Sequence, residues 1–517
     1  MSQTVVIGEA DLTFGDIVAV AREGARVELS QAALKVLAEG RALVDRLAAA
    51  PTPAYGISTG FGALATRHID PELRAQLQRS LIRSHAAGMG PLVEPEVVRA
   101  LTLMRLKTLA TGHTGVRPVV AETMAALLNA GIVPAVREFG SLGCSGDLAP
   151  LSHVALVLMG EGEVVGPDGV SVLPAGPVLA QHGIMPLELA PKEGLALING
   201  TDGMLGMLIL ALADLTELVK AADISAAMSV EALLGTDKVF RPELHAIRPH
   251  PGQAASAANL IKVLHDSPIM ESHREPNECT RVQDAYSLRC APQVAGAVRD
   301  TMAHAATVAE RELAAIVDNP VVLLSEGRVE SNGNFHGAPV AMVLDFLAIA
   351  VADLGSIAER RTDRMLDVAR SHGLPPFLAD DPGVDSGLMI AQYTQAALVS
   401  ENKRLAVPAS VDSIPSSAMQ EDHVSMGWSA GRKLRTAVDN LRRIIAVEMV
   451  TAARALDLRA PLVPAEGTGA AVRALRDGGV GGPGPDRFLS PELRAAEEAL
   501  KGGGVVAAVE AAVGTLG

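Results

Sequence analysis

The chain has 517 residues, a formal net charge of −15 and a mean hydropathy of +0.27, and 49% of its residues are hydrophobic. The acidic balance disfavours a nucleic-acid surface, because neutralising phosphates takes clustered Lys and Arg. The most apolar runs, 204–212 and 340–352, are too short or are interrupted by Asp, so we expect the apolar excess in a large core or between subunits.

Residues 1–198 predict a smaller, mixed N-terminal region of loops, short strands and helices. Glu94-Pro95 starts a helix that we expect to end near Ala110, before Gly112. Strands are expected at 4–7 and within 163–173, where the turn residues 166–169 favour a small hairpin.

Long helices are predicted from about residue 199 onward. Apolar residues recur at steps of three and four over 294–316, up to Asn319-Pro320, and again over 434–452. A third stretch, 340–364, contains no Pro. Aromatic residues make up only 2% of the chain, which favours helix-on-helix packing. We therefore predict a mainly α fold with a long central helical bundle over 199–476, then a Gly/Pro-rich linker and C-terminal helices over 477–517.

The three cysteines, Cys144, Cys279 and Cys290, show no C-x-x-C spacing and leave one unpaired. Neither a disulfide framework nor a zinc site is expected, and this usage fits a reducing cytoplasm. The thirteen histidines form no H-E-x-x-H or paired-ligand pattern, so no metal site is predicted.

The most unusual segment is the Gly-rich loop 140–153, Gly-Ser-Leu-Gly-Cys-Ser-Gly-Asp-Leu-Ala-Pro-Leu-Ser-His. A nucleophile elbow would need Gly at the position of Asp147, and a phosphate loop would need a Lys-Ser/Thr pair that does not follow. By composition alone, the simplest interpretation is a tight turn that caps a helix starting near Ala149.

A purely structural role does not account for several other polar segments. They are 55–62, Ser84-His85, 194–201, 282–289, 332–336 and 420–423. Two of the three tyrosines of the chain, Tyr55 and Tyr286, lie in them. With these segments in this order, and a small residue followed by Ser-Gly-Asp-Leu-x-Pro-Leu, the chain resembles the aromatic amino acid ammonia-lyase and aminomutase family from about Tyr55 to beyond Gly427.

The resemblance implies a self-made prosthetic group, methylidene-imidazolone (MIO), carried by the Gly-rich loop. Cys144, Ser145 and Gly146 would cyclise with loss of two waters, and Gly as the third residue lets the backbone bend into the ring. The family's commonest first residue is Ala, whereas this chain has Cys144, whose side chain stays outside the ring. Because such an electrophile helps an amine to leave, neither pyridoxal phosphate nor a metal is expected.

The resemblance also assigns roles to single residues. Tyr55 corresponds to the base that removes the β-proton, and Arg289 to the bidentate partner of the substrate carboxylate. The other assignments place Tyr286 near the amine or the prosthetic group, Asn199 and Gln283 on the prosthetic group's oxygen and the substrate, and Phe335 against the prosthetic group.

Structural alternatives stay open for several of these residues. Arg289 could be a helix-surface arginine. Asn199 could be a helix N-cap before Asp202, alone or in addition to its site role. Asp147 could assist ring formation or cap a helix.

Two positions favour histidine as the substrate, with urocanate and ammonia as the products. Ser84-His85 resembles the histidine-specific members of the family, and His85 can hydrogen-bond an imidazole. Glu421 resembles them too, and its carboxylate is a second candidate for the base besides Tyr55. The alternatives are a solvated helix-start role for Glu421, a tyrosine or phenylalanine ammonia-lyase or aminomutase, and an inactive scaffold. The resemblance further implies a homotetramer whose sites are shared between subunits.

Overall fold

The structure is a computed structural model that describes residues 3–49, 69–274 and 282–517. Tyr55 lies outside these ranges. Contacts divide the chain into two units, each built from three segments. The first unit comprises 1–210, 306–345 and 408–432, and the second comprises 211–305, 346–407 and 433–517. The predicted division at residues 198 and 476 stays a prediction.

The first unit combines short strands with helices of moderate length. Its elements are β1 (Thr4–Ile7), α1 (Phe14–Val18), the π-helix Ala19–Glu23, β2 (Arg26–Leu29), α2 (Gln31–Ala49), the 3-10 turn Pro71–Leu73, α3 (Arg74–His85), β3 (Met89–Leu92), α4 (Pro95–Leu109), α5 (Pro118–Asn129), β4 (Arg137–Phe139), α6 (Leu148–Leu158), β5 (Glu163–Val165), β6 (Val172–Pro174), α7 (Ala175–Gln181), α8 (Glu193–Ile198), β7 (Val321–Leu323), the 3-10 turn Leu324–Glu326, β8 (Arg328–Glu330) and the 3-10 turn Ser417–Met419.

Four long helices contribute residues to both units. They are α9 (Asp202–Ala232), α14 (Ala291–Ala314), α15 (Ala338–Leu366) and α17 (Gly427–Asp457). The remaining elements belong to the second unit: the 3-10 turns Lys238–Phe240 and Pro376–Leu378, α10 (Pro242–Ala246), α11 (Pro251–Val263), α12 (Pro268–Glu271), α13 (Tyr286–Arg289), α16 (Met389–Leu405), α18 (Glu466–Asp477), α19 (Ser490–Lys501) and α20 (Gly504–Val513).

The local predictions from the sequence are confirmed. The α4 helix starts at Pro95 and ends at Leu109, and Gly112 follows with a positive φ of 76°. The expected hairpin is the antiparallel pair β5–β6, and the first strand is β1, which pairs in parallel with β2. The expected long helices are α14, α15 and α17, so the fold is mainly α, as predicted.

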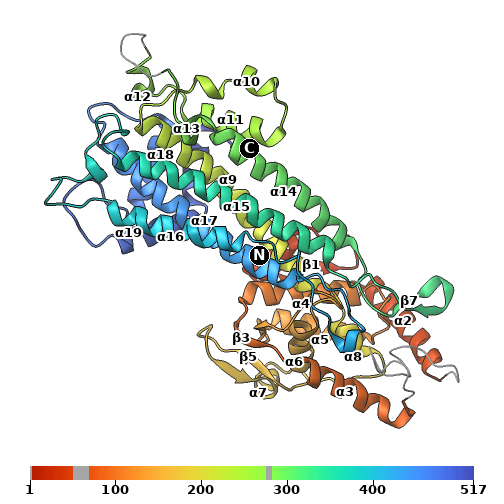
Figure 1. The fold of residues 1–517 in the computed structure, drawn as a ribbon. Coiled ribbons are helices and arrows are strands. Elements are labelled where there is room, and N and C mark those ends of the chain that lie inside the picture. Colours follow the sequence, from red (N-terminus) through yellow and green to blue (C-terminus); the bar gives the residue numbers. More distant parts are fainter. Residues whose placement is uncertain (1–2, 50–68, 275–281) are drawn as a thin grey trace. The chain divides into compact units, whose positions relative to one another are not determined.

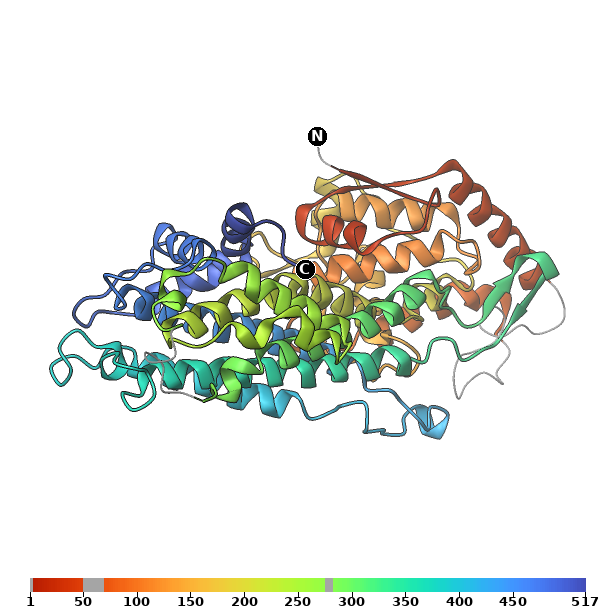
Figure 2. The same ribbon diagram turned by 90° about the horizontal axis from the view of Figure 1, so that it is seen from above.

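The second unit has a helical core that contains a buried ion pair between Arg361 and Glu448. Figure 1 shows α15, α16 and α17 side by side, and Ala358, Val399 and Ile444 make a buried contact between them. The Glu448 carboxylate accepts hydrogen bonds from the Arg361 guanidinium at 2.9 Å and from Ser229 Oγ at 2.7 Å. These bonds join α17 to α15 and α9. The α18, α19 and α20 helices, the darkest blue in Figure 2, pack on one another.

Two helical stretches of the described chain are long and apolar enough to cross a membrane by length and composition. These are Glu193–Ala232 and Ala338–Leu366, longer than the apolar runs noted in the sequence. The most apolar window is wholly buried in the first and 67% buried in the second. The core helices of a large helical fold pass the same test.

Candidate active site

The Gly-rich loop between β4 and α6 is pressed against neighbouring backbone. Gly146 has a φ of 77°, and a Cβ there would lie 2.1 Å from the Gly200 carbonyl oxygen. Gly143 has a φ of 67°, and its Cβ would lie 2.4 Å from Ser425 Oγ. Because L side chains rarely adopt such angles and the space is filled, both positions require glycine.

Asp147 fastens this loop to the first turn of α9. Its buried carboxylate accepts bonds from Ser141 Oγ at 2.8 Å and from the backbone nitrogens of Gly203 and Met204 at 2.9 and 3.0 Å. Its own N–H donates to the Gly200 oxygen at 2.7 Å. Burial raises the pKa of Asp147 to about 7. The expected capping role is thus real, but Asp147 makes no side-chain cap to α6, which begins at Leu148.

Glu421 contacts two residues of the predicted prosthetic-group tripeptide. Ser145 Oγ lies 3.0 Å from Glu421 Oε1, and Cys144 Sγ lies 3.1 Å from Oε2. Ser416 Oγ donates to the same Oε2 at 2.9 Å, and the backbones of the two residues exchange two further hydrogen bonds. Glu421 is half-buried outside any helix, so the solvated helix-start interpretation is wrong.

Cys144 is buried and Ser145 is half-buried, in a loop that several hydrogen bonds hold in place. The Cys144 side chain is buried, and burial, with a smaller contribution from the Glu421 hydrogen bond, raises the pKa of its thiol to about 11. The loop is further held by Ser425 Oγ, which donates to the Gly143 oxygen at 2.7 Å, and by Met426 N, which donates to the Leu142 oxygen at 2.8 Å. The segment that carries Glu421 therefore supports the tripeptide through side chains and backbone.

His85 is the last residue of α3 and lies within electrostatic range of Glu421. Burial lowers the pKa of His85, while a backbone hydrogen bond to Leu81 and the charge of Glu421 act in the opposite direction. Ser84 Oγ lies 3.0 Å from His85 Nδ1. The charge of Glu421 thus acts on His85, the other residue that favours an imidazole substrate.

Asn199 lies near this loop with one polar atom unpaired. It is buried, and its Nδ2 donates to the Asn319 oxygen at 2.8 Å. Its Oδ1 is buried and has no hydrogen-bond partner among the described residues. Asn199 ends α8, and α9 begins at Asp202, so the expectation that it caps α9 is wrong.

Phe335 belongs to a segment that touches the same loop. It is half-buried, and Gly337 N two residues later donates to the Gly143 oxygen at 3.1 Å. Between them, His336 stacks on His423 with ring centroids 5.7 Å apart. The packing of Phe335 against a prosthetic group stays a prediction.

The other predicted site residues belong to the second unit. The Arg289 guanidinium carbon lies 4.7 Å from the centre of the Tyr286 ring, a cation–π contact. Arg289 is half-buried, and its Nε is buried without a hydrogen-bond partner among the described residues, which argues against a plain surface arginine. Tyr286 is 71% exposed and Gln283 is exposed. Tyr55 lies outside the described residues.

Sequence reasoning missed two contributors to this site. Ser416, which holds Glu421, lies in a Pro-Ser-Ser run that gives no signal. Arg105 is wholly buried in α4, where its Nε donates to Asp202 at 3.0 Å and its Nη1 donates to the Ala196 oxygen at 3.1 Å. It thereby fixes the chain on both sides of Asn199. A charged residue between the apolar residues Met104 and Leu106 was the available clue.

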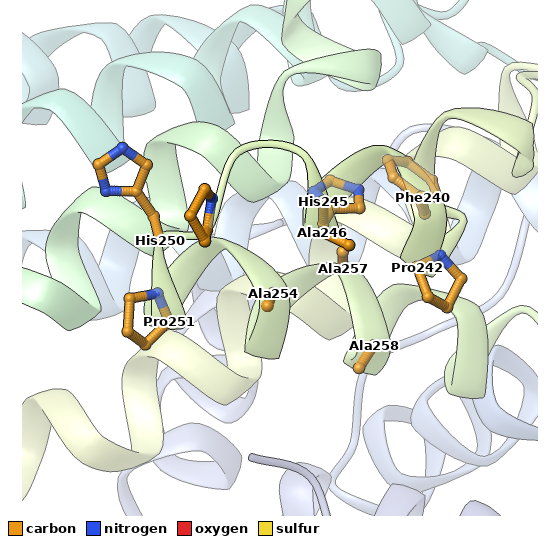
Figure 3. Close-up of a pocket in the computed structure, with 10 residues that line it drawn as sticks. Phe240, Pro242, His245, Ala246, His250, Pro251, Ala254, Ala257 and Ala258 are labelled. Carbon is orange, nitrogen blue, oxygen red and sulfur yellow. The ribbon is translucent and has the colours of Figure 1, made fainter.

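A pocket in the second unit, shown in Figure 3, contains none of the predicted site residues. Its volume is about 350 Å³, and it is lined mainly by Pro and Ala, with Phe240, His245 and His250. Both His245 ring nitrogens are engaged, one with Gln253 Nε2 at 2.9 Å and the other with the Val239 oxygen at 3.2 Å. His245 is therefore a structural histidine.

Comparisons with known proteins agree with this geometry. The family model described as aromatic amino acid lyase matches residues 12–477. A histidine ammonia-lyase of Streptomyces avermitilis is 71% identical over 513 residues, covering 99% of each chain. A tyrosine aminomutase from Streptomyces globisporus superimposes with a TM-score of 0.93 at 39% identity, covering 99% of this chain and 100% of the other. A histidine ammonia-lyase from Trypanosoma cruzi gives 0.89 at 38% identity, covering 99% and 96%.

The chain therefore belongs to the aromatic amino acid lyase family.

Proposed function

We propose that this protein is a histidine ammonia-lyase, which eliminates ammonia from L-histidine to give urocanate. The observation that carries the proposal is the contact of Glu421 with Cys144 and Ser145 of the tripeptide, together with the electrostatic interaction between Glu421 and His85. A carboxylate and an imidazole can between them pair with the N–H and the ring nitrogen of a substrate imidazole. The relative from Streptomyces avermitilis, named for this activity, is similar over nearly the whole chain.

We further propose that the tripeptide becomes the MIO group. The residues present fit such a group, because Gly146 already has a positive φ and the buried Asn199 Oδ1 lacks a partner among the described residues. Asn199 and Asp147 would hold the ring and its loop. When formed, the group supplies an electrophile that takes up the amine and so eases its departure.

The chain's own residues would then bind and orient the substrate. His85 and Glu421 hold the imidazole, and Arg289 receives the carboxylate, with Tyr286 beside it. Gln283 and Phe335 complete the binding surface. Tyr55 or Glu421 removes the β-proton. All of these assignments are part of the proposal.

The test is an ultraviolet assay with L-histidine, L-tyrosine and L-phenylalanine, each offered separately and without added cofactor. Absorbance of a conjugated product should rise with L-histidine alone. A response confined to tyrosine or phenylalanine would replace the substrate and favour the aminomutase-like branch of the family. Silence with all three, in a protein whose tripeptide has lost two waters, would contradict the proposed activity and favour the inactive scaffold.

A homotetramer with sites shared between subunits is also proposed. Large apolar side chains are exposed on α15 at Met342, Phe346 and Ile349, a spacing that places them on one helix face. Ile390 and Tyr393 on α16 are exposed as well. Burial of such faces against further copies of the chain is the expected reason. Sedimentation as a monomer at working concentration would contradict this assembly.

A cytoplasmic location is proposed on the chain's cysteine usage. Cys144 and Cys290 are free thiols, which suits a reducing compartment. Fractionation of the producing cells is the direct check.

A further inference from the structure

The short helix α8 is held at both ends by two consecutive residues of a distant segment. Lys192, directly before the helix, forms an ion pair of 2.6 Å with Asp318. Asn199, directly after the helix, donates from Nδ2 to the Asn319 oxygen at 2.8 Å. We propose that the Lys192–Asp318 pair is a positioning device for Asn199. The inference rests on the proposed function, because it concerns how that site presents one of its binding residues.

The bond to Asn319 determines which way the Asn199 amide group faces. A backbone carbonyl oxygen can only accept a hydrogen bond, so the amide nitrogen must be the atom on that side. The Asn199 Oδ1 is therefore turned away from Asn319, and it is buried without a partner among the described residues. Because a buried acceptor without a partner costs free energy, this orientation indicates that Asn199 is held ready to accept a hydrogen bond from a bound group.

Stability alone does not explain a charged pair in this position. The side chains of Lys192 and Asp318 are wholly buried. A buried ion pair often stabilises a fold no more than apolar residues of similar size, because both charges lose their hydration. Lys192 also has a φ of 74°, which residues with a side chain rarely adopt. Such conformations persist where surrounding contacts enforce them, and they cluster at functional sites. The pair therefore indicates a requirement for fixed geometry.

The Asp318 carboxylate passes the position of Lys192 on to the Asn319 backbone. Its Oδ2 accepts from Lys192 Nζ, and its Oδ1 accepts from the Asn319 nitrogen at 2.8 Å. Asn332 holds the other side of this segment. Its Nδ2 donates to the Asp318 oxygen at 3.0 Å, and its backbone nitrogen donates to Asn319 Oδ1 at 3.0 Å. The carbonyl that orients Asn199 is thus itself fixed, as a preorganised binding site requires.

The test is a double-mutant cycle between the ion pair and Asn199 in the full chain. Lys192→Met combined with Asp318→Asn, the pair variant, leaves no unpaired buried charge and keeps an acceptor for the Asn319 nitrogen. We expect it to lower kcat for L-histidine by about 10-fold to 100-fold, as a displaced site residue does. In an Asn199→Ala background the same two changes should lower kcat by less than about 3-fold, because the residue that they position is gone.

Two further measurements separate positioning from a general loss of structure. The value of kcat is counted per chain whose 144–146 peptide has lost two waters, so that incomplete maturation is not mistaken for slow turnover. Crystal structures give a readout that needs no turnover. The contact between Asn199 Nδ2 and the Asn319 oxygen should be present in the wild type and broken in the pair variant. Thermal unfolding checks that each variant is folded.

Lys220→Met combined with Glu510→Gln is the matched control. This ion pair of the second unit has the same design, because Glu510 Oε1 accepts from Lys220 Nζ at 3.0 Å and from the Leu516 nitrogen at 3.0 Å. Its removal also takes away a lysine and the charge of its acidic partner. The control should keep the wild-type kcat.

Asn332→Ala replaces the pair variant in the cycle if that variant does not fold. Asn332 is half-buried. The change removes the donor to the Asp318 oxygen, together with a local bond from the Asn334 nitrogen. It should lower kcat severalfold when Asn199 is present and have little effect in the Asn199→Ala background.

The inference is overturned if the effects of the pair variant and of Asn199→Ala on kcat multiply to within about 2-fold, because the two would then act independently. It is also overturned if the pair variant keeps the contact between Asn199 and Asn319. Either outcome leaves the proposed function intact. A wild-type protein that has lost both waters from its tripeptide and still releases no ammonia from L-histidine would instead contradict the proposed function, and the inference with it.

Discussion

Asp147 Oδ2 accepts a hydrogen bond of 2.9 Å from the backbone nitrogen of Gly203, across 56 residues of sequence. The bond ties the loop of the candidate prosthetic group to the start of α9, a 31-residue helix. An acidic side chain at a helix N-terminus also complements the partial positive charge there. The loop is therefore placed by one of the longest rigid elements of the fold.

This carboxylate should make stability depend on pH. Burial raises the pKa of Asp147 from 3.8 to about 7, so between these values the folded state binds more protons than the unfolded state. The free energy of unfolding should then fall as pH rises through this window. Thermal unfolding across it should show a steeper decline for the wild type than for Asp147→Asn. Parallel slopes would contradict the shift.

Asp147→Asn should also be less stable than the wild type, by about 1–3 kcal/mol. The amide nitrogen cannot accept a hydrogen bond, so one of the groups that Asp147 now satisfies loses its partner. Chemical denaturation at fixed pH measures this cost.

Gly146→Ala should abolish ring formation. The new Cβ would lie 2.1 Å from the Gly200 oxygen, which itself accepts a hydrogen bond from the Asp147 backbone nitrogen. Gly169→Ala is the matched control, since Gly169 has a similar φ of 71° with nothing within 4 Å of its Cβ. Both variants carry backbone strain of about 1–3 kcal/mol, but only Gly146→Ala should keep both waters by peptide mass. A mature Gly146→Ala protein would refute the packing argument.

His85→Leu should weaken histidine binding. Losing a hydrogen bond to a charged or buried polar partner costs about 1.5–3 kcal/mol, so KM for L-histidine should rise roughly 10-fold to 100-fold. Ser84→Ala, which removes the hydroxyl that lies 3.0 Å from His85 Nδ1 and donates to the Leu81 oxygen but leaves the imidazole in place, should raise KM by less. Steady-state kinetics measure KM for L-histidine in both variants. An unchanged KM in His85→Leu would contradict a role of His85 in substrate binding.

Cys144 should resist alkylation in the folded protein. Its thiol has a pKa raised to about 11 and is buried, whereas the thiolate is the reactive form. At about pH 8, iodoacetamide should label Cys144 about 100-fold more slowly than in unfolded chain, and the rate should climb as pH rises toward 11. Mass spectrometry of the labelled peptide gives the rate, and rapid labelling at neutral pH would contradict the structure.

Local patterns in the sequence predicted local structure well. Pro95 at the start and Gly112 after the end predicted α4, and the turn residues 166–169 predicted the β5–β6 hairpin. Apolar residues that recur at steps of three and four positions predicted the long helices α14 and α17. Each of these signals depends on neighbours within a few residues, which is the range over which periodicity and capping act.

Contacts between distant segments could not be predicted in the same way. Nothing near Ser416 shows that it supports Glu421, and nothing near Asp147 shows that it caps α9 in place of α6. The bond between Ser145 and Glu421 joins residues 276 positions apart. The sequence identified Glu421 through resemblance to a family, and only the fold reveals which atoms it meets.

The interleaving of the two units constrains how the chain can be made and cut. The first unit needs residues up to 432, and the second takes its last segment from 433–517. No single cut separates one unit from the other, and on the ribosome the first cannot be completed until more than four-fifths of the chain has emerged. Nascent helices would therefore expose apolar faces for much of translation, the situation in which chaperones protect a growing chain.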